Sequence, residues 1–143
     1  MSEQEETLDE ELAVERLNVA LSLQLRSALQ YSLTAASLVG FEIQAVGAKL
    51  TQYGDEELAD ARRLIEKIVL LDGTPTTDVG ELRAEGDPAA AIGWLVECET
   101  EAVEALQAAI EPTGREGRSE ALEHMIMRKQ AQVDFLERAR ATP

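Results

Sequence analysis

Four helix-length stretches of this sequence each carry an apolar seam that is interrupted near its middle by one polar residue. The members of each seam follow one another in steps of three and four residues, so they share one side of an α-helix. The first seam consists of Val14, Leu17, Leu21, Gln24, Ala28, Tyr31, Ala35 and Leu38. The interrupting residues of the four seams are Gln24, Glu57, Glu99 and Lys129. Because the apolar sides of helices meet in the core of a bundle, we expect these four side chains to converge there.

The seams predict an all-α protein built as a four-helix bundle. The predicted helices cover residues 8–39, 41–71, 87–111 and 117–140. Thr7 is the predicted N-cap of the first helix, with Glu10 as its capping-box partner. Asp87 followed by Pro88 predicts the start of the third helix. A chain of 143 residues is long enough for one core, so we expect a single domain over residues 1–143 with its bundle at about 8–140.

The connection between the second and third predicted helices is much longer than the other two. Residues 72–87 hold Gly73, Pro75, Gly80 and Gly86 among mostly polar neighbours, which is typical of an irregular connection. At about 3.3 Å per residue, this segment can travel the length of a bundle. The second and third helices would then run parallel, whereas the short connections make the other sequential pairs antiparallel.

Composition excludes several classes of function. A formal net charge of -15 argues against non-specific binding of nucleic acid, which needs clustered Lys and Arg. No apolar run approaches the roughly 18 residues of a membrane span, so no membrane partner is expected. The acidic N-terminus lacks a signal-peptide pattern, and the single cysteine, Cys98, has no partner for an internal disulfide. We therefore expect a cytoplasmic protein.

Two of the helices carry a second polar residue one turn after the first. Asp60 lies three residues after Glu57, and Gln132 lies three residues after Lys129. The four seams thus deliver one, two, one and two polar residues to the core. This distribution is typical of a two-metal carboxylate site, in which two helices supply one Glu each and the other two supply a Glu-x-x-His pair.

Three motifs resemble those of a known family. Leu17-Asn18 through Gln30-Tyr31 is similar to the first-helix pattern of the bacterioferritins, within the ferritin-like superfamily. The run Ile65-Glu66-Lys67-Ile68-Val69-Leu70-Leu71-Asp72-Gly73-Thr74-Pro75 resembles the exit of their second helix, and Val133-Asp134-Phe135-Leu136-Glu137 the end of their fourth. The resemblance covers residues 15–138. It implies a ferritin-like four-helix bundle with a long crossover between helices two and three, a di-iron site and a dimer.

The departures from the family pattern fall on the metal ligands. The resemblance places the six ligand positions at Gln24, Glu57, Asp60, Glu99, Lys129 and Gln132. Only Glu57 and Glu99 keep the family's residue, although Tyr31, a family feature near the metals, is also kept. Leu58 stands where the family has the Met that binds haem between two subunits, so haem is not expected. Because the sequence ends at Pro143, we do not expect the short fifth helix that helps these proteins close a 24-subunit shell.

Charge counting gives three interpretations of the site. Glu57, Asp60 and Glu99 supply three negative charges and Lys129 one positive charge, so two negative charges remain. The interpretation we favour is a buried salt-bridge network in which Lys129, Gln132 and Tyr31 take part and the Lys ammonium occupies the place of a metal. The second is a single divalent cation, such as iron, held by Glu57, Asp60, Glu99 and Gln24. The third is a working di-iron oxidase.

The sequence therefore supports three hypotheses of function. The first is a ferritin-like protein with a degenerate di-iron site, without ferroxidase activity or catalytic residues, that serves as a structural or partner-binding dimer or as a subunit of a mixed assembly. The second is iron binding and storage, with Fe(II) oxidation at the reduced carboxylate site. The third is a binder of a small ligand in a dimer groove. A second apolar stripe of Leu25, Leu29, Leu33 and Ile43 predicts a homodimer and leaves a larger ferritin-like assembly open.

Overall fold

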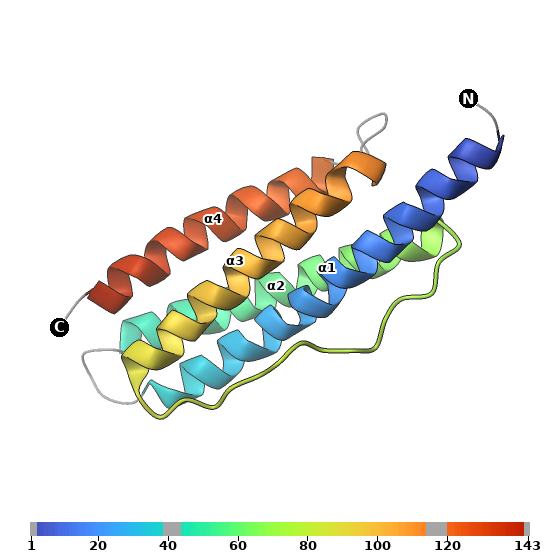
Figure 1. The fold of residues 1–143 in the computed structure, drawn as a ribbon. Helices are drawn as coiled ribbons and strands as arrows, with labels where there is room; N and C mark the ends of the chain where they lie inside the picture. The colour runs from blue at the N-terminus through green and yellow to red at the C-terminus, as the bar shows by residue number, and fades with distance from the viewer. Residues whose placement is uncertain (1–2, 39–43, 114–119, 142–143) are drawn as a thin grey trace.

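The computed structural model describes residues 3–38, 44–113 and 120–141, and these form a four-helix bundle (Figure 1). Its helices are α1 (Glu3–Ser37), α2 (Gln44–Leu70), α3 (Pro88–Thr113) and α4 (Glu120–Ala141). The described residues contain no strand. The prediction of an all-α bundle is confirmed. The predicted starts of the second helix at residue 41 and of the fourth at residue 117 lie outside the described residues.

The predicted start of the first helix is wrong. Helix α1 begins at Glu3 and already contains Thr7, so Thr7 does not cap it. The helix extends five residues further toward the N-terminus than the start predicted at residue 8.

The ends of α2 and α3 that flank the long connection are both capped, and the predicted N-cap of the third helix, Asp87, is confirmed. Gly73 N–H donates to Ile68 O (2.9 Å) and Asp72 N–H to Val69 O (3.0 Å), so α2 ends in a Schellman motif. The residue in the left-handed conformation is Asp72, with φ 61°. At the start of α3, Asp87 Oδ2 accepts from Ala90 N–H (2.9 Å), which makes Asp87 the N-cap.

Residues 73–87, called the strap below, run along α1 from one end of the bundle to the other (Figure 1). Asn18 of α1 donates to Thr74 O (3.0 Å) and accepts from Thr76 N–H (2.7 Å). Three helical turns later, Gln30 donates to Arg83 O (2.8 Å) and accepts from Arg83 N–H (2.9 Å). The strap makes α2 and α3 parallel, which is the crossover expected from the sequence.

The core consists of two apolar layers, one toward each end of the bundle. One layer includes Leu17, Leu21, Leu64, Ile68, Leu106, Leu122 and Met125. The other includes Tyr31, Leu38, Leu50, Ile92, Leu95 and Leu136. In every helix the residue that interrupts the seam lies between the members of the two layers. The fold therefore places a polar layer at mid-bundle.

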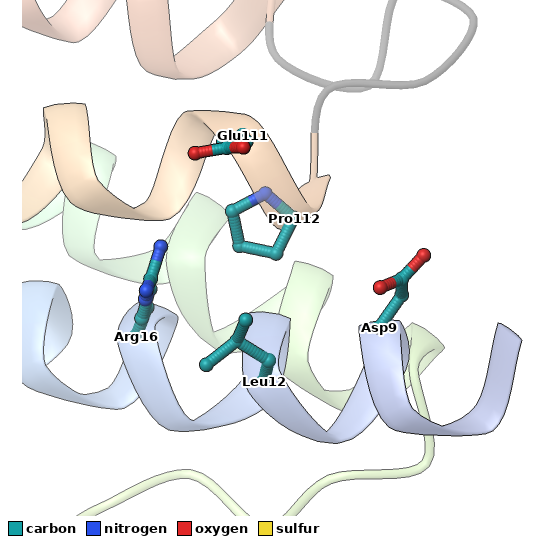
Figure 2. Close-up of a pocket in the computed structure, with 5 residues that line it drawn as sticks. All are labelled: Asp9, Leu12, Arg16, Glu111 and Pro112. Carbon is teal, nitrogen blue, oxygen red and sulfur yellow. The ribbon is translucent and has the colours of Figure 1, made fainter. Parts of the chain in front are cut away.

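An open pocket lies between α1 and the end of α3, away from this polar layer (Figure 2). Its lining residues are Asp9, Leu12, Arg16, Glu111 and Pro112. Arg16 Nη1 donates to Ala108 O (2.9 Å), so its guanidinium binds one carbonyl near the C-terminal end of α3. Among the described residues, no helix is both long and apolar enough to cross a membrane.

Candidate functional site in the bundle core

Six polar side chains from all four helices meet between the two apolar layers. They are Gln24 and Tyr31 from α1, Glu57 from α2, Glu99 from α3, and Lys129 and Gln132 from α4. Each is at most 1% exposed. We call this group the polar cluster. Helix α4 projects Lys129 and Gln132 from successive turns onto one side, as the spacing of three residues requires.

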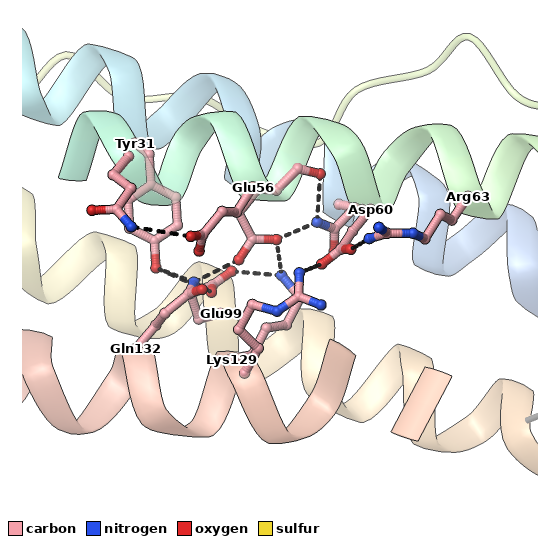
Figure 3. Close-up of polar contacts among 11 residues, drawn as sticks. Tyr31, Glu56, Asp60, Arg63, Glu99, Lys129 and Gln132 are labelled. Atoms are coloured by element: carbon pink, nitrogen blue, oxygen red, sulfur yellow. Dashed lines mark hydrogen bonds and ion pairs between the residues drawn. The ribbon is translucent and has the colours of Figure 1, made fainter. Parts of the chain in front are cut away.

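The Lys129 ammonium lies between two carboxylates. Its Nζ donates to Glu57 Oε2 (2.7 Å) and to Glu99 Oε1 (2.9 Å). Both distances are those of charge-assisted hydrogen bonds. Lys129 thus joins α4 to α2 and to α3 at the same level of the bundle. Figure 3 shows Lys129 directed at Glu99, one of these two acids.

Gln132 and Tyr31 bind the outer oxygens of the same carboxylates. Gln132 Nε2 donates to Glu57 Oε1 (2.7 Å) and to Glu99 Oε2 (3.0 Å). The same nitrogen lies 3.0 Å from Tyr31 OH, and Tyr31 OH in turn donates to Glu99 Oε2 (3.1 Å). All four carboxylate oxygens therefore accept hydrogen bonds from Lys129, Gln132 or Tyr31.

Gln24 completes the cluster on the side of α1. Its Nε2 donates to Glu57 O (2.8 Å) and also to Glu57 Oε2. Two buried acceptors of the polar cluster have no hydrogen-bond partner among the described residues, Gln24 Oε1 and Gln132 Oε1. Each amide nitrogen faces a carboxylate, which fixes the amide orientation and directs the oxygen elsewhere.

Burial and pairing shift the pKa values of the cluster in opposite directions. Burial disfavours the Lys129 ammonium, but its attraction to Glu57 and Glu99 prevails and raises the pKa of Lys129. For Glu57, burial acts upward, but the charge of Lys129 prevails and the pKa is lowered. For Glu99, burial raises the pKa to about 7 against the attraction of Lys129. Burial, with Glu99 and Glu57 nearby, raises the pKa of Tyr31 well above its usual value, so Tyr31 remains a neutral donor.

Asp60 does not join the polar cluster, although its seam position is one turn from Glu57. Its Oδ1 accepts from Arg63 Nη1 (2.6 Å) and its Oδ2 from Arg128 Nη1 (2.6 Å). The Asp60 side chain is 2% exposed, whereas those of Arg63 and Arg128 are 55% and 36% exposed. We call these three residues the Asp60 triad. Among the described residues, no group of three or more His, Cys, Asp or Glu side chains is arranged to hold a metal ion.

Neither arginine of the Asp60 triad was predicted to join the site. Arg63 lies three residues after Asp60 on the same helix, and Arg128 directly precedes Lys129. The i,i+3 spacing was the available signal for Arg63. The direction of Arg128 follows from the packing of α4 against α2, which the sequence does not give. The single histidine, His124, is exposed on α4 and lies outside the cluster.

The fold and the buried carboxylates define a class of protein. The chain belongs to the ferritin-like domain family, whose model matches residues 14–141. This confirms the superfamily that the three sequence motifs indicated. A comparison with curated proteins found no match.

Two solved structures illustrate the similarity of fold. A ferritin-like, diiron-carboxylate protein from Bacillus anthracis superposes with a TM-score of 0.84 at 24% sequence identity, over 98% of this chain and 99% of the other. The bacterioferritin of Rhodobacter capsulatus, described as having a metal-free dinuclear site and a heme iron, superposes with a TM-score of 0.78. It is 24% identical, over 87% of this chain and 81% of its own. At this level of identity the two structures establish the fold.

Proposed function

We propose that this chain is a ferritin-like protein in which Lys129 takes the place of metal, and that it acts as a structural or partner-binding subunit without ferroxidase activity. The observation that carries the proposal is the position of Lys129 Nζ, 2.7 Å from Glu57 and 2.9 Å from Glu99. An ammonium at that point supplies the positive charge and the directed bonds that two carboxylates would otherwise receive from a cation.

The residues present do not fit a pair of iron ions. A di-iron site sets about four carboxylates and two imidazoles against two cations. This core offers the carboxylates of Glu57 and Glu99, whose oxygens are already bonded to Lys129, Gln132 and Tyr31. Asp60, the third acid in the metal set expected from the sequence, is held by two arginines instead. A metal here would have to displace a buried ammonium and would be repelled by it.

Metal analysis tests the proposal directly. The chain would be purified from iron-supplemented cells and its metal content measured by atomic emission. We expect less than about 0.1 iron per chain, and no Fe(II)-dependent growth of absorbance in air. Two tightly held iron ions per chain would overturn the proposal.

A second candidate function is iron binding and storage at a reduced site of Glu57, Asp60, Glu99 and Gln24. Family membership favours it, and so do the two buried amide oxygens without a donor, Gln24 Oε1 and Gln132 Oε1. One bound divalent ion per chain, lost on Gln24→Ala but retained on Gln52→Ala, would select this function. Gln52 is an exposed glutamine of α2 and serves as the matched control.

We further propose that the subunit forms a homodimer through α1 and α2. Leu29, Leu33 and Leu58 are between 40% and 47% exposed, which is high for large apolar side chains of two adjacent helices. Ile43, which belongs to the same predicted stripe, lies outside the described residues. Sedimentation equilibrium of the wild-type chain and of a Leu29→Lys variant measures this dimer. A wild-type monomer at about 100 µM would contradict it.

A further inference from the structure

The polar cluster and the Asp60 triad are successive parts of one chain of contacts, which we call the polar row. Glu57 and Asp60 lie one turn apart on α2, and their partners Lys129 and Arg128 are adjacent on α4. Figure 3 shows the row extending from Tyr31 at one end to Arg63 at the other. Helices α2 and α4 are thus joined by two successive cations of one helix, each bound to an acid of the other.

The polar row has no net formal charge without any metal. In the polar cluster, the formal charges of Glu57, Glu99 and Lys129 sum to one negative charge. In the Asp60 triad, the formal charges of Arg63, Arg128 and Asp60 sum to one positive charge. The three acids and three bases therefore balance. The sequence-based count left two negative charges for a divalent ion because it did not include the two arginines.

The row reaches solvent at one end. Its other members, from Tyr31 to Asp60, are all buried, whereas Arg63 and Arg128 are partly exposed. A cation that approaches the row from this end therefore meets two guanidinium groups before any carboxylate of the row. The two guanidinium groups repel a cation, whereas the protein as a whole attracts cations to its surface, because its net charge is -15.

We propose that Arg63 and Arg128 form a cationic cap that keeps divalent metal ions away from the buried acids of the row. This inference rests on the proposed function, since Lys129 fills the site that the cap protects. The Lys129 ammonium determines the equilibrium affinity of the site for a metal ion. The cap decides how fast a metal ion from solvent arrives, because like charge at the mouth of a low-dielectric site lowers the local cation concentration.

The test uses Co(II), whose visible absorbance reports binding, and a Lys129→Gln background in which the ammonium is removed. The association rate is measured by stopped flow and the affinity by calorimetry. Adding Arg63→Gln and Arg128→Gln should raise the association rate about tenfold. The matched control adds Arg62→Gln and Arg140→Gln, which remove the same charge from exposed positions. The control should leave the rate within about twofold of the Lys129→Gln parent.

Two further measurements separate charge from new ligation. Raising NaCl from about 0.1 M to about 1 M shortens the Debye length from about 10 Å to about 3 Å, so the rate difference should shrink severalfold. Adding Asp60→Asn to the arginine variant removes the carboxylate that the arginines released. If the arginines act through their charge, association stays faster than in the control. A rate that returns to the parent value would mean that Asp60 had become a ligand, and would overturn the cap.

The proposal also fails if the arginine variant and its control bind Co(II) at equal rates, or if neither binds it. Circular dichroism checks that each variant folds. Should the combined variant not fold, the single Arg63→Gln substitution, compared with Arg62→Gln, should still give about a threefold increase. Failure of the cap is distinguishable from failure of the proposed function, which depends on the iron content of the unmodified chain.

Discussion

The polar row between α2 and α4 and the strap along α1 both join distant segments, but through different chemistry. The row uses charged groups that are buried at mid-bundle, such as Lys129 with Glu57. The strap uses neutral amides, because Asn18 and Gln30 each donate to and accept from its backbone. A neutral amide can satisfy both of its groups on one peptide segment, whereas a buried charge needs an opposite charge nearby. The row should therefore be more sensitive than the strap to the loss of one member.

The largest effect is expected for Lys129→Met. This change leaves the buried Glu57 and Glu99 without their cation, and stranding buried charge typically costs about 3–5 kcal/mol. Urea unfolding followed by circular dichroism measures the loss. A loss below about 1 kcal/mol would contradict the arrangement of Lys129 described above.

A triple variant provides the control for this prediction. Lys129→Met combined with Glu57→Gln and Glu99→Gln removes the cation and both acids together. Because replacing a whole buried ionic group is often close to neutral, the triple variant should recover at least half of the stability lost in the single variant. No recovery would mean that Lys129 stabilises the bundle by packing and not by charge.

The second effect is a pH dependence of the free energy of unfolding, and it arises from Glu99 of the polar row. Burial raises the pKa of Glu99 to about 7, above the ordinary value of 4.5 that applies in the unfolded chain. The protonated carboxyl therefore contributes stability that is fully present below about pH 4.5 and is lost as pH rises through 7. At 1.36 kcal/mol per pKa unit, a shift of about 2.5 units corresponds to a loss on the order of 3 kcal/mol.

Glu99→Gln should remove this component of the pH dependence. The free energy of unfolding, measured between pH 5 and pH 8, should fall less steeply in the variant than in the wild-type chain. Glu101→Gln is the matched control, because Glu101 is an exposed acid two residues away that pairs with Arg26. Identical slopes for wild type and Glu99→Gln would be inconsistent with a raised pKa at Glu99.

The third effect tests the strap. Gln30→Leu leaves both backbone groups of Arg83 without partners and also removes the acceptor of Trp94 Nε1 (3.0 Å). Unsatisfied groups of this kind cost about 1–3 kcal/mol, and these can partly rehydrate, so we expect a loss of about 2 kcal/mol. Tryptophan fluorescence should shift to longer wavelength as the strap loosens over Trp94. A loss as large as that of Lys129→Met would remove the distinction between row and strap.

The four-helix architecture could be predicted from the sequence because every helix repeats the same pattern. The apolar periodicity located the helices, and Gly73 and Asp87 marked the ends of the long connection. The convergence of Glu57, Glu99 and Lys129 was also predictable, since residues on the inner sides of packed helices must meet. These features follow from helix geometry alone.

The directions of individual side chains could not be predicted in the same way. Asp60 shares the inner side of α2 with Glu57, yet it binds arginines at the edge of the bundle. Arg128 approaches from another helix, and its Nη1 lies 2.6 Å from Asp60 Oδ2, a contact that the helical pattern does not indicate. The roles of Asn18 and Gln30 were missed for a related reason, because hydrogen bonds to an irregular segment leave no periodic trace in the sequence.

The smallest effect is expected where the strap begins, and it has the opposite sign. Asp72 adopts φ 61°, a conformation that costs a residue with a Cβ about 1 kcal/mol relative to glycine. The added flexibility of the unfolded chain offsets about 0.4–1 kcal/mol of this cost, so Asp72→Gly should stabilise the fold by at most about 0.6 kcal/mol. Gly73→Ala is the matched comparison. A Cβ at position 73 would lie 2.6 Å and 2.8 Å from the methyl carbons of Val14, so this change should destabilise the fold. Thermal unfolding of both variants measures the pair. If Asp72→Gly lowered the melting temperature, the Asp72 side chain would itself be holding the strap, and the strap would depend on a charged group as the row does.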